Sequence, residues 1–130
     1  MARMIFPNLP VSDLERSKAF YTGLGFALNE QFTNDQAAAV VISDDIVVML
    51  LSPAFAELSG VPLTRTPSQT LALALDSREE VDAIVDRAVA AGGTLKREAD
   101  EDGFMYSRGI DDPDGHVWDF LWMDPAAIEG

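Results

Sequence analysis

The sequence predicts an α+β fold in which two βαβββ modules form one domain. Three observations support this prediction. Two Ser-x-x-Glu tetrapeptides, at residues 12–15 and 77–80, lie half of the 130-residue chain apart. Each one follows an apolar strand end and opens a predicted helix that stops at glycine. After each helix, the apolar residues change to the spacing of short strands separated by turns.

The first module is predicted to cover about residues 1–60. Its first strand ends at Leu9-Pro10-Val11, and Ser12 is expected to cap a helix that ends at Gly23 or Gly25. Asp44-Asp45 has the length of a two-residue hairpin loop, although it lacks the glycine that such turns favour. The elements expected after the helix are strands at 26–32, 37–43 and 46–51, and a short helix within 53–60.

The second module is predicted to cover about residues 69–125, after a proline-containing connector at 61–68. Ser77 is expected to cap its helix, whose apolar stripe must face a sheet. That stripe consists of Val81, Ile84, Val85, Ala88 and Val89. Strands are expected at 94–98, 104–110 and 117–122, with turns at 100–103 and 112–115. One half alone would bury too little apolar surface, so a single domain over residues 1–130 is expected.

Composition excludes several classes of function. The net charge is −13, from 22 acidic and 9 basic residues, so nucleic acids and anionic membranes are not expected as partners. The absence of cysteine rules out disulfides, thiolate metal sites and a cysteine nucleophile. The N-terminus lacks a signal-peptide core, and the longest apolar run, at 46–51, is far shorter than the about 20 residues that span a bilayer. We therefore expect a cytoplasmic protein.

Two motifs carry a family resemblance that extends over nearly the whole chain. The segment from Asn8 to Phe26 contains Val-x-Asp-Leu-Glu-Arg-Ser, then Phe-Tyr, then Leu-Gly-Phe, and residues 112–116 read Asp-Pro-Asp-Gly-His. Together with the duplication, they resemble the vicinal-oxygen-chelate superfamily, which includes glyoxalases, bleomycin-resistance proteins and extradiol dioxygenases. The resemblance implies the duplicated βαβββ fold with a cup-shaped mixed sheet and, by analogy only, the functions found on it.

The resemblance also implies where metal-dependent members would place their ligands. These positions fall on Phe6, near Met49, on Thr70 (or Gln69 if the register slips) and on Asp119. One plausible metal ligand of the four, Asp119, remains, because Phe6 and Met49 offer no hard donor, whereas a divalent first-row metal needs about three imidazoles or carboxylates. The single histidine, His116, is expected to be an exposed turn residue that points away from Asp119. We therefore expect no metal and no other cofactor, and an apolar pocket lined by Phe6 and Met49.

Asp119 is the candidate catalytic residue, as a general base, because it lies in an apolar strand between two aromatic residues. The alternative is a structural role, paired with Arg108 or with the backbone. The remaining candidate ligand-binding residues are Phe6, Asn8, Met49, Thr70, Tyr106 and Arg108; which face of the sheet Tyr106 and Arg108 occupy is left open.

The leading hypothesis is a metal-independent protein of the bleomycin-resistance type that binds a small organic ligand in a cavity between the two modules. The first alternative is a glyoxalase-like lyase or isomerase, related to lactoylglutathione lyase, with Asp119 as the base. A non-catalytic dimerisation module is the second alternative. A homodimer is expected from the resemblance and from Trp118, Phe120 and Trp122, which need cover.

Overall fold

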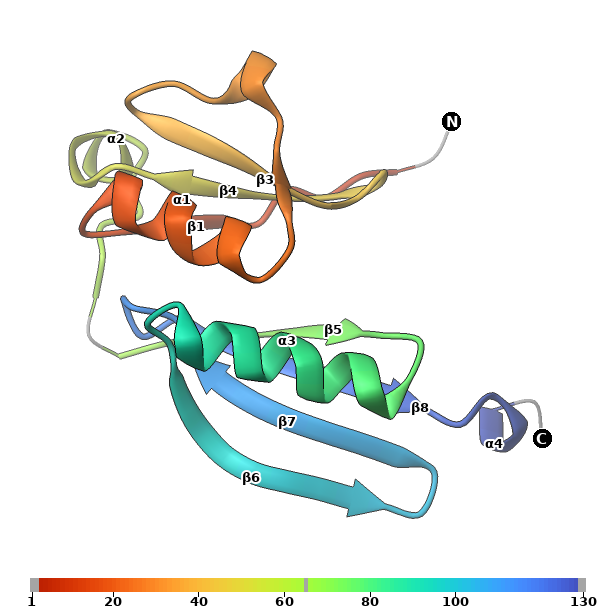
Figure 1. Cartoon of the computed structure of the whole chain (residues 1–130). Coiled ribbons are helices and arrows are strands. Elements are labelled where there is room, and N and C mark those ends of the chain that lie inside the picture. Colours follow the sequence, from red (N-terminus) through yellow and green to blue (C-terminus); the bar gives the residue numbers. More distant parts are fainter. Residues whose placement is uncertain (1–2, 65, 129–130) are drawn as a thin grey trace. The chain divides into compact units, whose positions relative to one another are not determined.

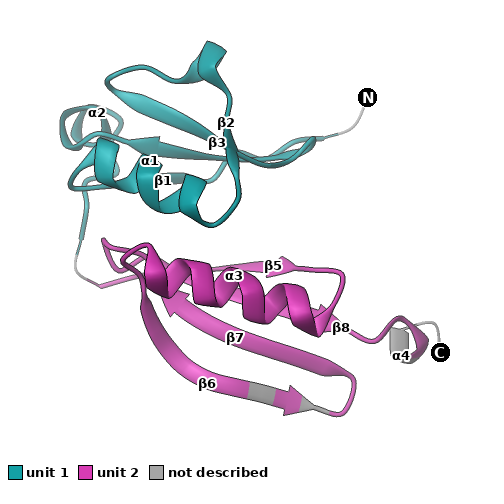
Figure 2. Ribbon diagram, in the orientation of Figure 1, with its two compact units in different colours: residues 1–65 teal, residues 66–130 magenta. Residues whose placement is uncertain are grey.

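The computed structural model describes residues 3–64 and 66–128. The chain divides into two compact units, Met1–Arg65 and Thr66–Gly130 (Figure 2). Each unit contains a strand, a helix and three further strands in that order, as the duplication predicts (Figure 1). The division falls inside the predicted connector at 61–68. Each unit has its own four-stranded mixed sheet, which confirms the predicted α+β class.

Unit 1 has the sheet order β1-β4-β3-β2, in which β1 is parallel to β4 and the other pairs are antiparallel. A short 3-10 helix, η1, follows β2, and α2 follows β4. The elements are β1 (Asn8–Pro10), α1 (Leu14–Gly23), β2 (Ala27–Leu28), η1 (Glu30–Phe32), β3 (Ala37–Ser43), β4 (Ile46–Leu51) and α2 (Pro53–Leu58).

The main core of unit 1 lies on the α1 face of its sheet, and a smaller buried cluster of Ala37, Leu51 and Ala56, against which Met49 packs, includes residues of the opposite face. Helix α1 contacts β3 and β4 and buries Leu14, Phe20 and Tyr21. The sheet side chains buried in this unit include Leu9, Ala38, Val40, Val48 and Leu50. Because successive side chains of a strand alternate between faces, the residues between them, such as Asn8, Ala39 and Met49, lie on the opposite face.

Unit 2 has the sheet order β5-β8-β7-β6, with β5 parallel to β8. Its elements are β5 (Thr70–Ala74), α3 (Arg78–Ala90), β6 (Thr94–Asp102), β7 (Met105–Asp111), β8 (Val117–Met123) and α4 (Pro125–Ile128). Helix α3 contacts β6, β7 and β8 and buries its predicted stripe at Val81, Ile84, Val85 and Ala88, while Val89 is 48 % exposed.

The aromatic residues of β8 belong largely to this core. Trp118 and Phe120 are buried, and their rings stack with centroids 5.8 Å apart. Trp122 is half-buried and lies beneath Arg78, whose guanidinium carbon is 5.3 Å from the centre of the Trp122 ring. Two of the three aromatic side chains that were expected to need a second subunit are therefore buried in the single chain.

The helix starts differ from the prediction in one case. Ser77 caps α3 as expected, because its side chain accepts a hydrogen bond from the backbone N–H of Glu80. Glu80 reaches back to the backbone N–H of Asp76, 2.8 Å away. The cap of α1 is Asp13 and not Ser12: the Asp13 carboxylate accepts from the N–H of Arg16 at 3.1 Å, and the Ser12 hydroxyl accepts from the Arg16 guanidinium.

Two predicted strands have other limits. Of the strand expected at 26–32, only β2 forms, and η1 follows it. The Asn29 side chain accepts a hydrogen bond from the N–H of Gln31, and this local hydrogen bond favours a turn over pairing with a neighbouring strand. Strand β6 runs on to Asp102, through residues expected to form a turn. As an edge strand it can carry charged side chains into solvent. The strands at 37–43 and 46–51 and their two-residue loop are confirmed.

Candidate functional site

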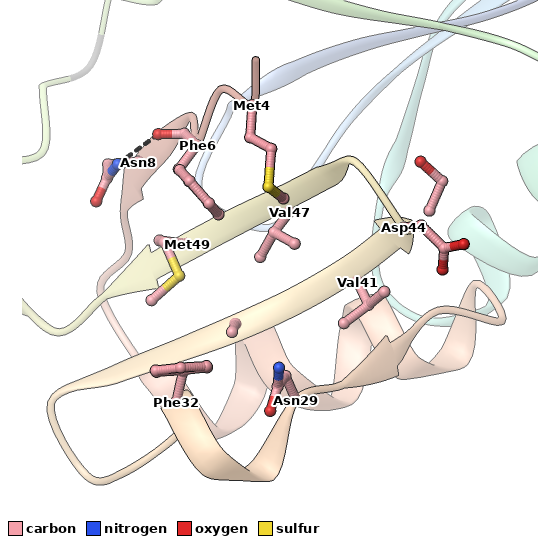
Figure 3. Close-up of a pocket in the computed structure, with 11 residues that line it drawn as sticks. Met4, Phe6, Asn8, Asn29, Phe32, Val41, Asp44, Val47 and Met49 are labelled. Carbon is pink, nitrogen blue, oxygen red and sulfur yellow. Dashed lines mark hydrogen bonds between the residues drawn. The ribbon is translucent and has the colours of Figure 1, made fainter. Parts of the chain in front are cut away.

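A cavity of about 660 Å³ lies on the face of the unit 1 sheet opposite the α1 core (Figure 3). Most of its lining is apolar. In the register of the sheet, Met49 on β4 lies between Asn8 on β1 and Ala39 on β3, and Val47 is paired with Val41. The small side chain of Ala39 leaves space beside Met49. The lining residues are Met4, Phe6, Asn8, Asn29, Phe32, Ala39, Val41, Ser43, Asp44, Val47 and Met49.

The cavity carries large apolar side chains that a folded protein normally covers. Met4, Phe6 and Phe32 are 46 %, 48 % and 60 % exposed. They lie around the same hollow as Met49 and Val47 (Figure 3). Scattered apolar residues on a surface need no explanation, but a cluster around a concavity is typical of a ligand-binding site.

Polar groups are few and lie toward the margin of the cavity. The Asn8 amide donates a hydrogen bond of 2.6 Å to the carbonyl of Phe6, so this amide is held by its own strand. Asn29 precedes η1, and Asp44 is at the tip of the β3–β4 hairpin. Among the lining residues that the structure describes, Asp44 is the only charged one. The site therefore offers much apolar contact, two amides, one hydroxyl (Ser43) and one carboxylate.

Three of the predicted ligand-binding residues, Phe6, Asn8 and Met49, come together in this cavity. Thr70 and Asp119 lie in unit 2. Thr70 is exposed on β5 next to Val117, and Asp119 is paired with Ala72 two residues further on. The two side chains therefore share one face of the unit 2 sheet.

Asp119 has a charged partner that the sequence did not indicate. The Arg97 guanidinium on β6 forms an ion pair with the Asp119 carboxylate and also donates to the Ser107 hydroxyl at 3.1 Å. The alternative of a salt bridge between Asp119 and Arg108 is wrong, because the two side chains project from opposite faces: Arg108 is paired with Phe120, the neighbour of Asp119.

Tyr106 and Arg108 lie on the face of the sheet that packs against α3. Both donate to Oδ1 of Asp82 on that helix, at 2.6 Å and 3.0 Å. The hydrogen bond to Asp82, followed by desolvation, raises the pKa of the Tyr106 phenol above its ordinary value of 10.0. This network ties β7 to α3, and the structure does not bring Tyr106 or Arg108 together with Asp119.

His116 is not the exposed turn residue that was expected, because its side chain is half-buried. It closes a turn organised by Asp112, which is 3 % exposed and whose Oδ1 accepts from the backbone N–H groups of Asp114 and His116, both at 2.9 Å. This Asp-Pro-Asp-Gly-His motif therefore shapes the entry into β8.

The donors at the four positions implied by the resemblance do not fit a divalent first-row metal. Phe6 has no donor atom, Met49 has a soft thioether, Thr70 has a neutral hydroxyl, and Asp119 is paired with Arg97. Among the described residues, no group of three or more histidine, aspartate or glutamate side chains could hold a metal ion. In the same part of the chain, no helix has the length and apolar character needed to cross a membrane.

The protein-family model of the Glyoxalase/Bleomycin resistance protein/Dioxygenase superfamily matches residues 3–120 of the sequence. The chain belongs to this family. Two solved structures are each 31 % identical to it: a hypothetical protein from S. aureus (TM-score 0.79, covering 94 % of both chains) and a glyoxalase-related enzyme from Fulvimarina pelagi (TM-score 0.78, covering 94 % of this chain and 88 % of the other).

A fosfomycin resistance protein from Mesorhizobium loti has the same fold at 17 % identity, with a TM-score of 0.73 over 100 % of this chain and 99 % of its own. At that identity the likeness supports the fold alone. No curated protein matches the chain.

Proposed function

We propose that this protein is a metal-independent member of its family that binds a small organic ligand, with the unit 1 cavity as the binding site. The observation that carries the proposal is the cluster of exposed Met4, Phe6 and Phe32 side chains around a cavity of about 660 Å³. Pockets of about 300–1,000 Å³ with mostly apolar walls and few polar groups are typical of small-molecule sites. The expectation that the binding cavity lies between the two modules stays a prediction.

Methionine methyl groups provide the test. Met4 and Met49 line the cavity, whereas Met105 and Met123 lie on β7 and β8 of unit 2. In protein labelled with ¹³C at the methionine methyl groups, a ligand from a panel of small aromatic compounds should shift the Met4 and Met49 signals. A panel that shifts neither signal, or that shifts only Met105 and Met123, would contradict the proposal.

The first alternative is a glyoxalase-like lyase or isomerase with Asp119 as the base. It is favoured by the fact that Asp119 lies beside a guanidinium, that of Arg97, which is 40 % exposed. Such a group could stabilise an enediolate in the absence of a metal. Turnover of the hemithioacetal of methylglyoxal and glutathione, abolished in Asp119→Asn, would establish this activity. Elemental analysis of the same preparation must then find no stoichiometric metal.

A homodimer and a cytoplasmic location are also proposed. Because Trp118 and Phe120 are already buried in the single chain, the proposed dimer rests on family resemblance and not on these side chains. Sedimentation at micromolar concentration should give about twice the 14.1 kDa of the chain. A monomer throughout a dilution series would exclude it.

A further inference from the structure

We infer that Asn29 determines the specificity of the unit 1 cavity by donating a hydrogen bond to an acceptor group on an aromatic ligand. This inference rests on the proposed function and names the class of ligand: a compact aromatic compound that carries a carbonyl or another neutral acceptor. The inference is based on the turn that contains Asn29, in which side-chain hydrogen bonds fix both the amide and the main chain of this residue.

The orientation of the Asn29 amide is set by the backbone of η1. The Oδ1 atom accepts a hydrogen bond of 3.1 Å from the N–H of Gln31. Of the two terminal atoms of the Asn29 amide, only the oxygen can accept a hydrogen bond from an N–H group. The atom that faces the Gln31 N–H is therefore Oδ1, and the other atom is Nδ2. That nitrogen points into the cavity (Figure 3). The cavity wall therefore presents a donor.

The main chain around Asn29 is also fixed. Its N–H donates to the carbonyl of Ala39 at 2.9 Å. Its carbonyl accepts from the Thr33 hydroxyl at 2.8 Å, and the same hydroxyl accepts from the N–H of Ala39 at 3.0 Å. The side chain of Asn29 is thus attached to a closed loop of hydrogen bonds with β3. A donor held in this way loses little freedom when it binds a ligand.

The same turn supplies an aromatic surface. Phe32 is the last residue of η1, and its ring is 60 % exposed and lines the cavity with Asn29. Phe6 is a second exposed ring in the lining. Aromatic rings favour stacked or edge-on contact with a flat ligand. One fixed donor beside two rings therefore suits an aromatic carbonyl compound better than an aliphatic acid.

A matched pair of probes tests the inference. Indane and 1-indanone have the same bicyclic skeleton, and only 1-indanone has a carbonyl acceptor. We expect both to shift the Met4 and Met49 methyl signals, with 1-indanone binding about tenfold more tightly, because its acceptor satisfies a donor that indane leaves unpaired. Equal affinities would overturn the inference but leave the proposed cavity intact. If neither compound shifts these signals, the proposed function fails, and the inference fails with it.

Asn29→Asp is the decisive variant. Aspartate retains the oxygen that accepts from Gln31, so η1 should persist, but the donor is replaced by an acceptor. The preference for 1-indanone over indane should disappear. Asn34→Asp is the control: Asn34 also accepts from backbone N–H groups, those of Gln36 and Ala37, and lies outside the cavity lining. It adds the same charge and should keep the preference. Loss of the preference in both variants, or its retention in both, would overturn the role of Asn29.

Discussion

Arg97 on β6 and Asp119 on β8 form an ion pair across the intervening strand β7. Gly109 on β7 is paired with both residues, and the Cβ that an alanine would add there lies 3.5 Å from Cγ and from Nε of Arg97. The stem of Arg97 therefore runs over a glycine. This ion pair holds the Asp119 carboxylate in a defined position. It does so whether or not Asp119 takes part in a reaction.

We expect Asp119→Asn and Arg97→Gln to be coupled. The two side chains are 25 % and 40 % exposed, so solvent screens their attraction, and the coupling free energy should be about 0.5–1 kcal/mol. Urea unfolding of both single variants and the double variant measures it. Fluorescence reports on unit 2, because both tryptophans, Trp118 and Trp122, lie there. Additive effects of the two substitutions would show that the ion pair does not contribute to stability.

The hydrogen bond from Tyr106 to Asp82 should make stability depend on alkaline pH. The pKa of the Tyr106 phenol is raised in the folded protein, so folding favours the neutral phenol. Its contribution is fully present below the ordinary pKa of 10.0 and is lost as the pH rises through the folded value. We expect wild type to exceed Tyr106→Phe in unfolding free energy by about 0.5–1.5 kcal/mol at neutral pH.

The comparison with Tyr106→Phe removes the contributions of Tyr21 and of the lysines, which are common to both proteins. Urea unfolding followed by circular dichroism at a series of pH values provides the measurement. The difference between the two proteins should shrink above pH 10.0. A difference that stays constant through this range would contradict the assigned role of Asp82.

Ser12 and Ser77 occupy equivalent positions in the two Ser-x-x-Glu tetrapeptides, but their replacement should have different effects on stability. Ser77→Ala should cost about 1 kcal/mol, because Ser77 caps α3. Ser12→Ala should cost much less, and Asp13→Ala should show the loss of about 1 kcal/mol instead, because Asp13 caps α1. Thermal or urea unfolding of the three variants checks this order. A larger loss for Ser12→Ala than for Asp13→Ala would contradict the observed cap.

The fold could be predicted from sequence because its signals are local and repeated. The apolar stripe of α3 and the strands at 37–43 and 46–51 follow from periodicity, and glycines mark the ends of both helices. The cap of α1 could not be assigned in this way, since Ser12 and Asp13 are adjacent and both are good capping residues. Only the three-dimensional path of the chain decides between them.

The candidate site was predictable only where strands are regular. Alternation places Phe6 and Asn8 on one face, and both line the cavity with Met49. Arg97 was missed because β6 has a bulge between Leu95 and Arg97. With regular pairing after Leu95 and Ile110, Arg97 would lie opposite Arg108; the extra residue places it opposite Gly109 and on the face of Asp119.

Asn29 and Phe32 were missed for a similar reason. The sequence at 26–32 predicts a strand, and a strand would place residues 29 and 32 on opposite faces. The 3-10 turn brings them to the same cavity instead. Side-chain hydrogen bonds such as that from Asn29 to Gln31 depend on a local competition that periodicity does not reveal.

Phe32 should matter for binding and not for folding. Its ring is 60 % exposed in the absence of a ligand, so Phe32→Ser should change the free energy of unfolding by no more than about 0.5 kcal/mol. Phe20 is 1 % exposed in the α1 core, and Phe20→Ala should cost about 3–5 kcal/mol. If the Phe32 ring stacks on the ligand, Phe32→Ser should weaken 1-indanone binding about three- to tenfold. Circular dichroism melts and titrations of the Met49 methyl signal measure the two effects separately. A variant that binds normally would remove Phe32 from the site, and one that unfolds as readily as Phe20→Ala would assign the ring to the core.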